Sequence, residues 1–200
     1  MIVGVTGGIG AGKTTVCSLF RSFGVPFISA DELAHQLLDN DPVVFKAITK
    51  KFGPTILSLA TTINRHKLQE IIFNSTKDKL WLEKLLHPLI KQAIMSRAQA
   101  VEFPYCIVEI PLLIEAEMEN SVDRILTVDA PENLQLARAM QRDNSSKDTV
   151  QSIMAQQVTR KIRLAKSHDI IENVADLEAL KKLVIYHHNY YLSLATHEKH

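Results

Sequence analysis

The stretch GGIGAGKT spans residues 7–14 and directly follows an apolar run at residues 2–5. Its spacing fits the pattern GxxxxGK[ST], in which glycines let the backbone turn tightly and aim its N–H groups at phosphate oxygens. In this pattern Lys13 reaches the β- and γ-phosphates, and the Thr14 hydroxyl ligates Mg²⁺. The stretch therefore predicts a phosphate-binding loop, or P-loop, after a buried first strand.

The helix expected after this loop, at residues 13–23, would point its positive N-terminal end at the same phosphates, and Gly24 is well placed to end it. A flexible glycine-rich loop is the alternative, but the full spacing and the flanking strand and helix favour nucleotide binding. Kinases, switch GTPases and motor ATPases share such a loop, so it does not identify the acceptor. The predicted nucleotide contacts are Gly8, Gly10, Ala11, Gly12, Lys13, Thr14 and Thr15.

Length and charge fit one compact soluble α/β core. The 200 residues carry 23 basic and 22 acidic side chains, so no large field attracts nucleic acid or an anionic membrane. No apolar run approaches the ~18 residues that span a bilayer, and no signal sequence opens the chain. Cys17 and Cys106 lie far apart in the sequence, which suits reduced core thiols and predicts a cytoplasmic protein.

Short apolar runs alternate with longer helical stretches, which predicts an α/β fold with a parallel five-stranded sheet flanked by helices. The expected strands are at residues 2–5, 25–29, 105–110, 124–128 and 169–171. We expect one domain of the P-loop NTPase type over residues 1–200, with its core at residues 1–31, 102–131 and 168–200.

Two long segments of the chain lie outside this predicted core. Residues 32–101 are too long for an ordinary crossover and predict an inserted helical substrate lobe, broken at Asp41-Pro42, Gly53-Pro54 and His87-Pro88. Residues 132–167 are rich in Gln, Arg and Lys and predict a mobile, basic helical lid. A terminal helix is expected at residues 177–194, with His187 as a hydrogen-bonded packing residue. Its predicted packing stripe is Leu177, Leu180, Leu183, Val184, His187 and Tyr191.

Asp31 follows the second predicted strand, and ligands of open α/β sheets bind outside the carboxyl ends of the strands. A carboxylate there can orient an acceptor hydroxyl and take its proton during phosphoryl transfer. Alternatively, Asp31 caps a helix that begins near Glu32. Position alone does not separate these two roles.

Together these features resemble the dephospho-CoA kinase family over nearly the whole chain. The family's TGGIGSGKS is similar to residues 6–14, with Ala11 and Thr14 in place of serines. Thr14 keeps a metal-binding hydroxyl, and at Ala11 the backbone N–H does the binding. The family's aspartate after strand two, with a histidine four residues later, matches Asp31 and His35. His35 is alternatively a helix residue with a partner of its own.

Within the helical lobe, the family's acidic-Arg-x-x-Leu segment is similar to residues 64–68, where Asn64 replaces the acid. Its Leu-Glu-x-x-x-His-Pro-x-Ile segment is similar to residues 82–90. The resemblance implies that Arg65 and His87 belong to the wall that receives the coenzyme A portion. The alternatives are a solvated cation at Arg65 and, at His87, a residue that starts a helix ahead of Pro88.

The family's Pro-Leu-Leu-x-Glu is present at residues 111–115, where Glu115 is alternatively a helix-start residue. The lid pattern Gln-x-x-Arg-x-x-x-Arg matches Gln135, Arg138 and Arg142. By resemblance, the Arg142 guanidinium bridges phosphate oxygens and neutralises charge that develops during transfer. Ala175 replaces a frequent family glycine, so adenine contacts near Asn173 do not follow from the resemblance.

The resemblance implies transfer of the ATP γ-phosphoryl group to the ribose 3′-hydroxyl of dephospho-CoA, giving CoA and ADP, with Mg²⁺ as cofactor. Lys13, Asp31 and Arg142 would be catalytic, and the protein would be a monomer or a small homo-oligomer. Glu109 and Asp129 end strands near the site; each contacts metal-bound water or is a solvated strand end, and the second role is favoured for Asp129. The rivals are another small-molecule kinase of this fold and a nucleotide-binding regulatory protein.

Overall fold

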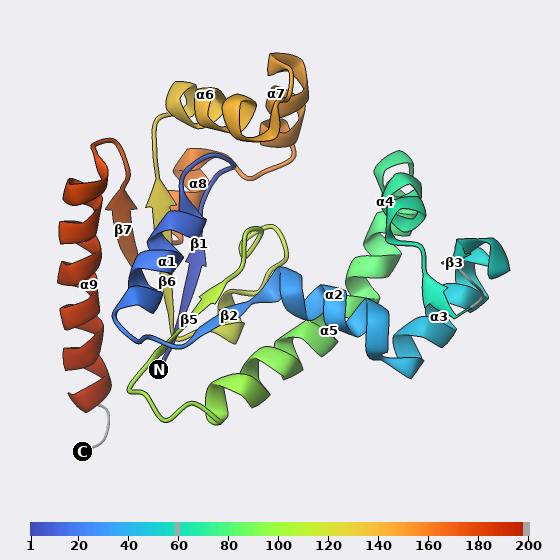
Figure 1. The fold of residues 1–200 in the computed structure, drawn as a ribbon, viewed down its shortest axis with the longest axis horizontal. Helices are drawn as coiled ribbons and strands as arrows, with labels where there is room; N and C mark the ends of the chain where they lie inside the picture. The colour runs from blue at the N-terminus through green and yellow to red at the C-terminus, as the bar shows by residue number, and fades with distance from the viewer. Residues whose placement is uncertain (59–60, 198–200) are drawn as a thin grey trace. The chain divides into compact units, whose positions relative to one another are not determined.

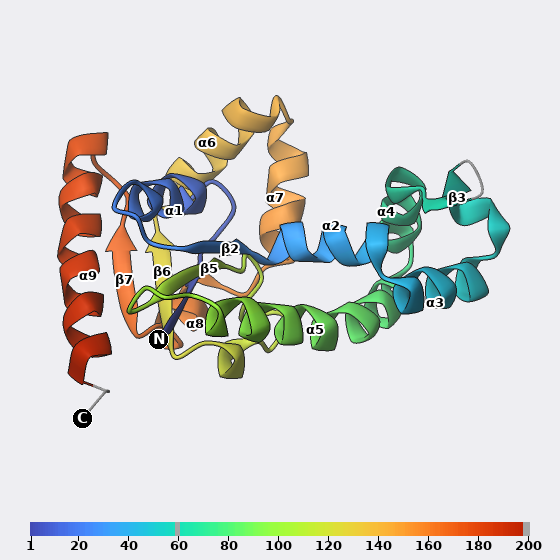
Figure 2. The same cartoon turned by 60° about the horizontal axis from the view of Figure 1, so that its bottom comes forward.

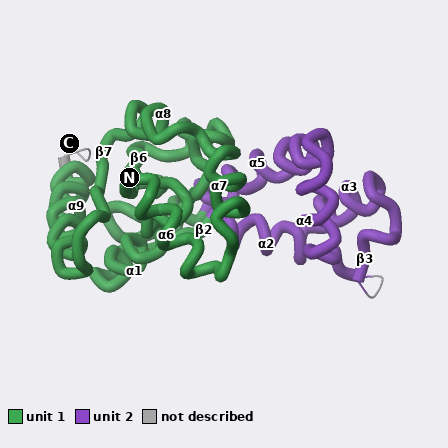
Figure 3. The backbone as a smooth tube through the Cα atoms, turned by 90° about the horizontal axis from the view of Figure 1, so that it is seen from above, with its two compact units in different colours: residues 1–29, 97–200 green, residues 30–96 purple. Residues whose placement is uncertain are grey.

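The computed structural model describes residues 1–58 and 61–197, with the exception of the His197 side chain. The chain divides into two compact units (Figure 3). The first comprises Met1–Ser29 and Arg97–His200, and the second comprises Ala30–Ser96. No helix in the described part of the chain combines the length and apolar character needed to cross a membrane.

The first unit is built on a parallel sheet of five strands in the order β2-β5-β1-β6-β7, as the sequence predicts (Figure 1). The strands are β1 (Ile2–Thr6), β2 (Phe27–Ser29), β5 (Cys106–Glu109), β6 (Arg124–Asp129) and β7 (Asp169–Glu172). Strand β2 is two residues shorter than predicted, because Pro26 has no N–H for the ladder. Val5 and Ser29 both pair with Glu109, so these strands end together at one edge of the sheet.

Helices α1 (Lys13–Ser22) and α9 (Leu177–His197) pack on each other beside the sheet (Figures 1 and 2). Helix α1 buries Val16, Cys17 and Phe20 on one face, as its apolar spacing requires. The Phe20 ring stacks on Tyr191 of α9 with centroids 6.2 Å apart, and both side chains are fully buried. Truncating a buried phenylalanine of this kind to alanine costs about 3–5 kcal/mol.

The predicted packing stripe of α9 is partly wrong. Leu177 is 58% exposed and Leu183 is 38% exposed, because the buried face follows Leu180, Val184 and Tyr191 instead. His187 is buried, and its Nδ1 lies 2.9 Å from the Leu183 carbonyl oxygen, so its predicted packing role is supported. Cys17 and Cys106 are buried free thiols, as expected.

Residues 132–167 form three helices: α6 (Glu132–Asp143), α7 (Lys147–Ala155) and α8 (Arg160–Ala165). Figure 1 shows α6 and α7 beyond the arrowheads of β1 and β6, where the strands end. A short 3-10 helix, η2 (Glu119–Ser121), precedes β6. Ser146 and Thr159 cap α7 and α8 through their side-chain oxygens. The lid segment is thus helical, as the sequence predicts.

The second unit is helical, and its elements are α2 (Ala30–Asn40), α3 (Pro42–Phe52), the 3-10 helix η1 (Pro54–Ile56), β3 (Leu57–Ser58), β4 (Thr62–Ile63), α4 (Arg65–Asn74) and α5 (Thr76–Gln99). Helix α5 continues a few residues into the first unit. The Asp41 carboxylate caps α3 by accepting from the N–H groups of Val43 and Val44, at 2.8 and 2.9 Å. Asn64 caps α4 in the same way through Lys67.

Two expectations for this unit fail. The short antiparallel pair β3 and β4 was not predicted. The break expected at His87-Pro88 is absent, because α5 runs through Pro88 without ending. Proline removes one helical hydrogen bond, but buried Leu86 and Ile90 on either side hold the helix against its neighbours. His87 therefore lies inside a helix and does not start one.

Candidate active site

The P-loop joins β1 to α1, and its backbone conformation depends on glycine. Gly10 has a φ of 71° and Gly12 a φ of 98°, both in the left-handed region that favours glycine. A Cβ on Gly10 would lie 2.2 Å from the Gln135 backbone oxygen, and one on Gly12 would lie 2.2 Å from Asn173 Nδ2. Side chains at either position would thus push the loop off its neighbours.

Lys13, the first residue of α1, folds over this loop. Its Nζ donates to the Gly7 carbonyl oxygen at 2.8 Å and to the Gly8 oxygen at 3.0 Å. Burial lowers the pKa of Lys13 to about 8, the charge of Glu109 opposes that effect, and Arg163 and Arg142 add to it. An incoming phosphate would strongly stabilise the charged form of this ammonium, because phosphate oxygens would replace the water that burial removes.

The Thr14 hydroxyl and the Glu109 carboxylate lie together beside the loop. Thr14 Oγ1 donates to Glu109 Oε1 at 3.4 Å, at the edge where β5 ends. Within residues 1–58 and 61–197, no group of three or more His, Cys, Asp and Glu side chains could hold a metal ion. The pair nevertheless suits Mg²⁺, which takes few protein oxygens and completes its shell with phosphate oxygens and water.

Side chains from distant segments hold the loop from outside. Asn173 follows β7, and its side-chain Nδ2 donates to the Ala11 carbonyl oxygen at 2.8 Å. Arg138 donates to the backbone carbonyl oxygen of Asn173 at 2.9 Å. From the segment between α7 and α8, Gln157 Oε1 accepts from the Ile9 N–H at 3.1 Å. The loop is therefore fixed by the end of the sheet and by the lid segment together.

Asp129 is not the solvated strand end that the sequence suggested. It is 3% exposed, and Arg160 Nε lies 2.9 Å and 3.0 Å from its two carboxylate oxygens. Hydrogen bonding to Asp129 raises the pKa of Arg160 above its usual range. The carboxylate is thus committed to an ion pair that ties α8 to the end of β6.

Glu115 likewise starts no helix, because residues 111–117 form consecutive turns. Its Oε1 accepts from the Val158 N–H at 2.9 Å and lies 3.8 Å from the guanidinium of Arg163. Burial lowers the pKa of Arg163, and Glu115 opposes that shift. The glutamate of the Pro-Leu-Leu-x-Glu segment therefore anchors the end of the lid.

Comparison with known proteins identifies the family. The family model described as dephospho-CoA kinase matches residues 1–179. A dephospho-CoA kinase of Coxiella burnetii is 43% identical over 194 residues, covering 96% of this chain and 98% of the relative. One of Pasteurella multocida is 43% identical over 198 residues, covering 97% and 96%. The chain belongs to the dephospho-CoA kinase family.

Solved structures agree with this assignment. A dephospho-CoA kinase from Campylobacter jejuni superimposes with a TM-score of 0.70 at 30% identity, covering 92% of this chain and 94% of that one. A Thermus thermophilus protein gives 0.80 at 28% identity, covering 94% and 97%. A shikimate kinase from Acinetobacter baumannii gives 0.54 at 17% identity over 96% and 93% of the two chains, a likeness of fold alone. The chain thus has the fold of P-loop small-molecule kinases.

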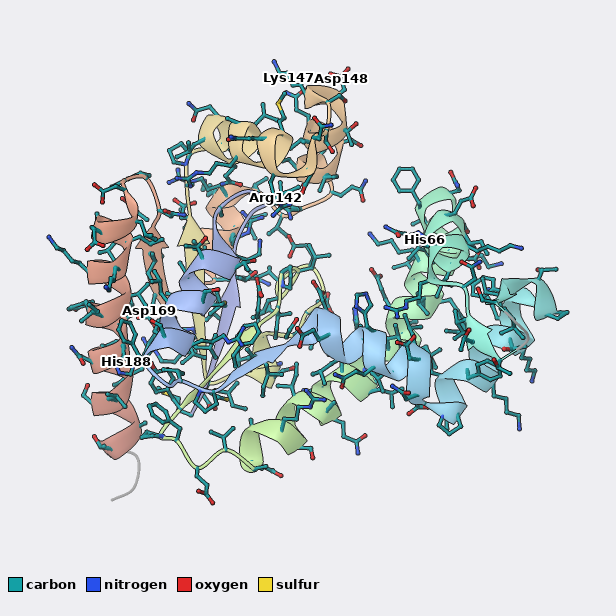
Figure 4. The ribbon with its side chains drawn as sticks, viewed as in Figure 1. His66, Arg142, Lys147, Asp148, Asp169 and His188 are labelled. Carbon is teal, nitrogen blue, oxygen red and sulfur yellow. The ribbon has the colours of Figure 1, made fainter. Side chains whose placement is uncertain are left out.

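Arg142, the predicted lid residue of this kinase, lies in the last turn of α6 (Figure 4). Its Nε and NH2 each donate at 2.7 Å to the carboxylate of the adjacent Asp143, and its side chain is 62% exposed. The hydrogen bonds raise the pKa of Arg142. Since its charge also acts on Lys13, Arg142 lies within electrostatic reach of the P-loop.

The other predicted substrate residues of the kinase belong to the second unit. Helix α2 begins at Ala30, so Asp31 lies in its first turn and is not its cap. Asp31, His35 and Asp39 are exposed and follow each other at intervals of four, on one face of the helix. Arg65 of α4 donates to Asp39 at 3.0 Å, so it is ion-paired and not simply solvated. That pair places Arg65 against the face that carries Asp31.

His87 is partly buried within α5. Sequence reasoning assigned neither Asn173 nor Gln157 a contact with the P-loop. Asn173 stands directly after β7, and its position at the carboxyl end of a strand was a usable signal. Gln157 lies 148 positions from Ile9, and no local pattern reveals such a contact.

Proposed function

We propose that this chain transfers the γ-phosphoryl group of ATP to the ribose 3′-hydroxyl of dephospho-CoA, giving CoA and ADP in the last step of coenzyme A biosynthesis. The observation that carries the proposal is the family match over residues 1–179, together with a P-loop whose Lys13 is buried over the loop carbonyls. A kinase for another acceptor would keep the loop without matching this family.

Lys13 and the backbone N–H groups of the P-loop hold the triphosphate in this mechanism. The nucleotide contacts proposed are Gly8, Gly10, Ala11, Gly12, Lys13, Thr14 and Thr15. The Lys13 ammonium now donates to the carbonyl oxygens of Gly7 and Gly8. When ATP binds, phosphate oxygens would replace these carbonyl oxygens as its hydrogen-bond acceptors. Charge that develops on the transferred group is then met by fixed donors that need no rearrangement.

Thr14 would hold Mg²⁺ directly, and Glu109 would hold it directly or through bound water. Their oxygens lie 3.4 Å apart, and they combine a hydroxyl with a carboxylate, oxygen ligands of the kind that magnesium prefers. A bound Mg²⁺ held by these residues would supply positive charge that offsets the negative charge of the phosphates.

Asp31 orients the acceptor hydroxyl and takes its proton. The carboxylate is exposed in the first turn of α2, two residues after β2 ends at the edge that Glu109 shares. His35 and Arg65 would bind the acceptor from the same side of α2, and His87 would contribute to that wall. The Arg142 guanidinium would exchange the Asp143 carboxylate for phosphate oxygens of the nucleotide. A phosphate group accepts two parallel hydrogen bonds as a carboxylate does, and it carries more negative charge.

The protein acts on small molecules in this proposal, as a monomer or a small homo-oligomer that contacts neither nucleic acid nor membrane. Its two buried free thiols fit a reducing cytoplasm.

ADP formation from ATP and Mg²⁺ tests the acceptor. Parallel reactions would contain dephospho-CoA, adenosine, AMP, a sugar acid or no acceptor. We expect turnover with dephospho-CoA far above every other reaction. Equal turnover with a sugar acid would assign the chain to another kinase activity, and tight ATP binding without acceptor-dependent ADP would indicate a regulatory protein.

A further inference from the structure

Gln157 contacts the phosphate-binding loop from a segment that the reaction does not otherwise use. Its Oε1 accepts from the Ile9 N–H at 3.1 Å. Ile9 is the third residue of the GGIGAGKT stretch, so its amide belongs to the row of loop donors. One member of that row is therefore held by a side chain between α7 and α8.

The backbone beside Gln157 is fixed on both sides. The Val158 N–H donates to Glu115 at 2.9 Å, and the Val158 oxygen accepts from Arg163 at 2.9 Å. Glu115 and Arg163 lie 3.8 Å apart with side chains 16% and 6% exposed. The Gln157 N–H itself donates to the Met154 oxygen at 3.1 Å. Gln157 therefore extends from an anchored backbone, and its reach to Ile9 is set by the fold.

The same loop segment also lies close to Gln135 of α6. A Cβ on Gly8 would lie 2.0 Å from Gln135 Oε1, and one on Gly10 would lie 2.2 Å from its backbone oxygen. Residues 8–10 therefore lie close to Gln135, and the Ile9 N–H among them donates to Gln157. A cavity of about 280 Å³, lined by both glutamines together with Arg160 and Arg163, opens beside them. Gln157 thus borders this cavity while its Oε1 holds the Ile9 N–H.

We propose that Gln157 is a positioning residue for the P-loop. Its side-chain oxygen holds the Ile9 amide, and so holds residues 8–10 in the conformation in which the remaining loop amides face the triphosphate. Glu115 and Arg163 set this contact by anchoring Val158, which links the end of the lid to the nucleotide site. The inference rests on the P-loop binding ATP and not on which acceptor the kinase uses.

Substitution of Gln157 by methionine tests this role, because methionine keeps the length of the side chain and lacks the amide oxygen. Gln156→Met is the matched control, since Gln156 is the exposed neighbour in the same segment. Two quantities are measured without any acceptor: hydrogen exchange of the Ile9 amide in the absence of nucleotide, and the Kd of MgATP by calorimetry. Thermal melting of each variant separates a local effect from general unfolding.

We expect the Ile9 amide to exchange on the order of tenfold faster in Gln157→Met than in the control. Loss of one net hydrogen bond should weaken MgATP binding by about two- to tenfold, with unchanged melting temperature. Gln157→Glu restores an oxygen acceptor of the same reach, so the exchange rate should return to that of the wild type. Its added negative charge should still weaken MgATP binding.

Equal exchange rates and equal Kd values in Gln157→Met and Gln156→Met would overturn the proposal. Tighter MgATP binding by Gln157→Met would also overturn it, because Gln157 would then compete with phosphate for the Ile9 amide. Neither readout contains dephospho-CoA, so a wrong acceptor leaves the test intact.

Discussion

Lys13 should make ATP binding depend on pH, because its ammonium is buried over the P-loop carbonyls. Burial lowers its pKa from the ordinary lysine value of 10.5 to about 8, although the nearby Glu109 favours the charged form. About nine-tenths of the molecules then carry the charge at pH 7 and about one-tenth at pH 9. A triphosphate brings several negative charges to Nζ and raises this pKa again, so the complex binds more protons than the free protein.

The size of the effect follows from that linkage. Above about pH 8, the affinity for MgATP should fall roughly tenfold per pH unit, and each binding event should take up about half a proton at pH 8 and nearly a whole proton at pH 9. Calorimetry in buffers of different ionisation enthalpy measures both quantities. Lys13→Arg is the control, since a guanidinium keeps its charge throughout this range.

A Kd that stays constant between pH 7 and pH 9.5 would refute this reasoning, as would the same slope in Lys13→Arg. An NMR titration of the Lys13 side chain gives a direct check that needs no nucleotide. A midpoint above pH 10 would show that the ammonium is more hydrated than its position against the loop carbonyls implies.

Three further results are expected. Asp31→Asn should lower kcat on the order of a hundredfold or more, with the Kd of ATP nearly unchanged, since only proton transfer and orientation are lost; equal losses in kcat and affinity would point to a folding or metal-site role. Arg163→Met should lower the free energy of unfolding in urea by about 3 kcal/mol, because it leaves the carboxylate of the largely buried Glu115 without its cation. Adding Glu115→Gln should recover part of that loss, and strictly additive effects would contradict the pair. Burial lowers the pKa of His188, whose Nδ1 lies 2.7 Å from the Tyr105 hydroxyl. The stability that neutral His188 contributes should therefore be complete above the unfolded pKa of about 6.5 and be lost as pH falls below it. Melting temperatures from pH 7.5 to pH 5 should drop less in His188→Phe than in the wild type, and parallel curves would refute this.

The sequence was sufficient where local spacing decides structure. The GGIGAGKT stretch can place Lys13 correctly because the turn, the helix start and the lysine lie within eight consecutive residues. The five parallel strands followed from short apolar runs separated by helical stretches. Asp41-Pro42 and Gly53-Pro54 ended helices as expected, because each combines a cap or a positive φ with a proline.

The sequence failed where distant contacts decide. Pro88 stays inside α5 because packing of that helix outweighs one missing hydrogen bond. Asp129 is buried because Arg160 reaches it from 31 positions away. Contacts of this kind depend on how α8 and the sheet meet, and no pattern within a short window contains that information. The predicted roles of Asp31, Arg65 and Arg142 stay predictions until variants are assayed.

The central claim is that this chain phosphorylates the 3′-hydroxyl of dephospho-CoA, and locating the transferred phosphate tests it most directly. The enzyme would be incubated with MgATP and either dephospho-CoA or its 3′-deoxy analogue, and the products would be analysed by phosphorus NMR and mass spectrometry. We predict a new phosphate ester on the ribose 3′ position with dephospho-CoA and no phosphorylated product with the analogue. Phosphorylation of the analogue, or of any other position, would contradict the account.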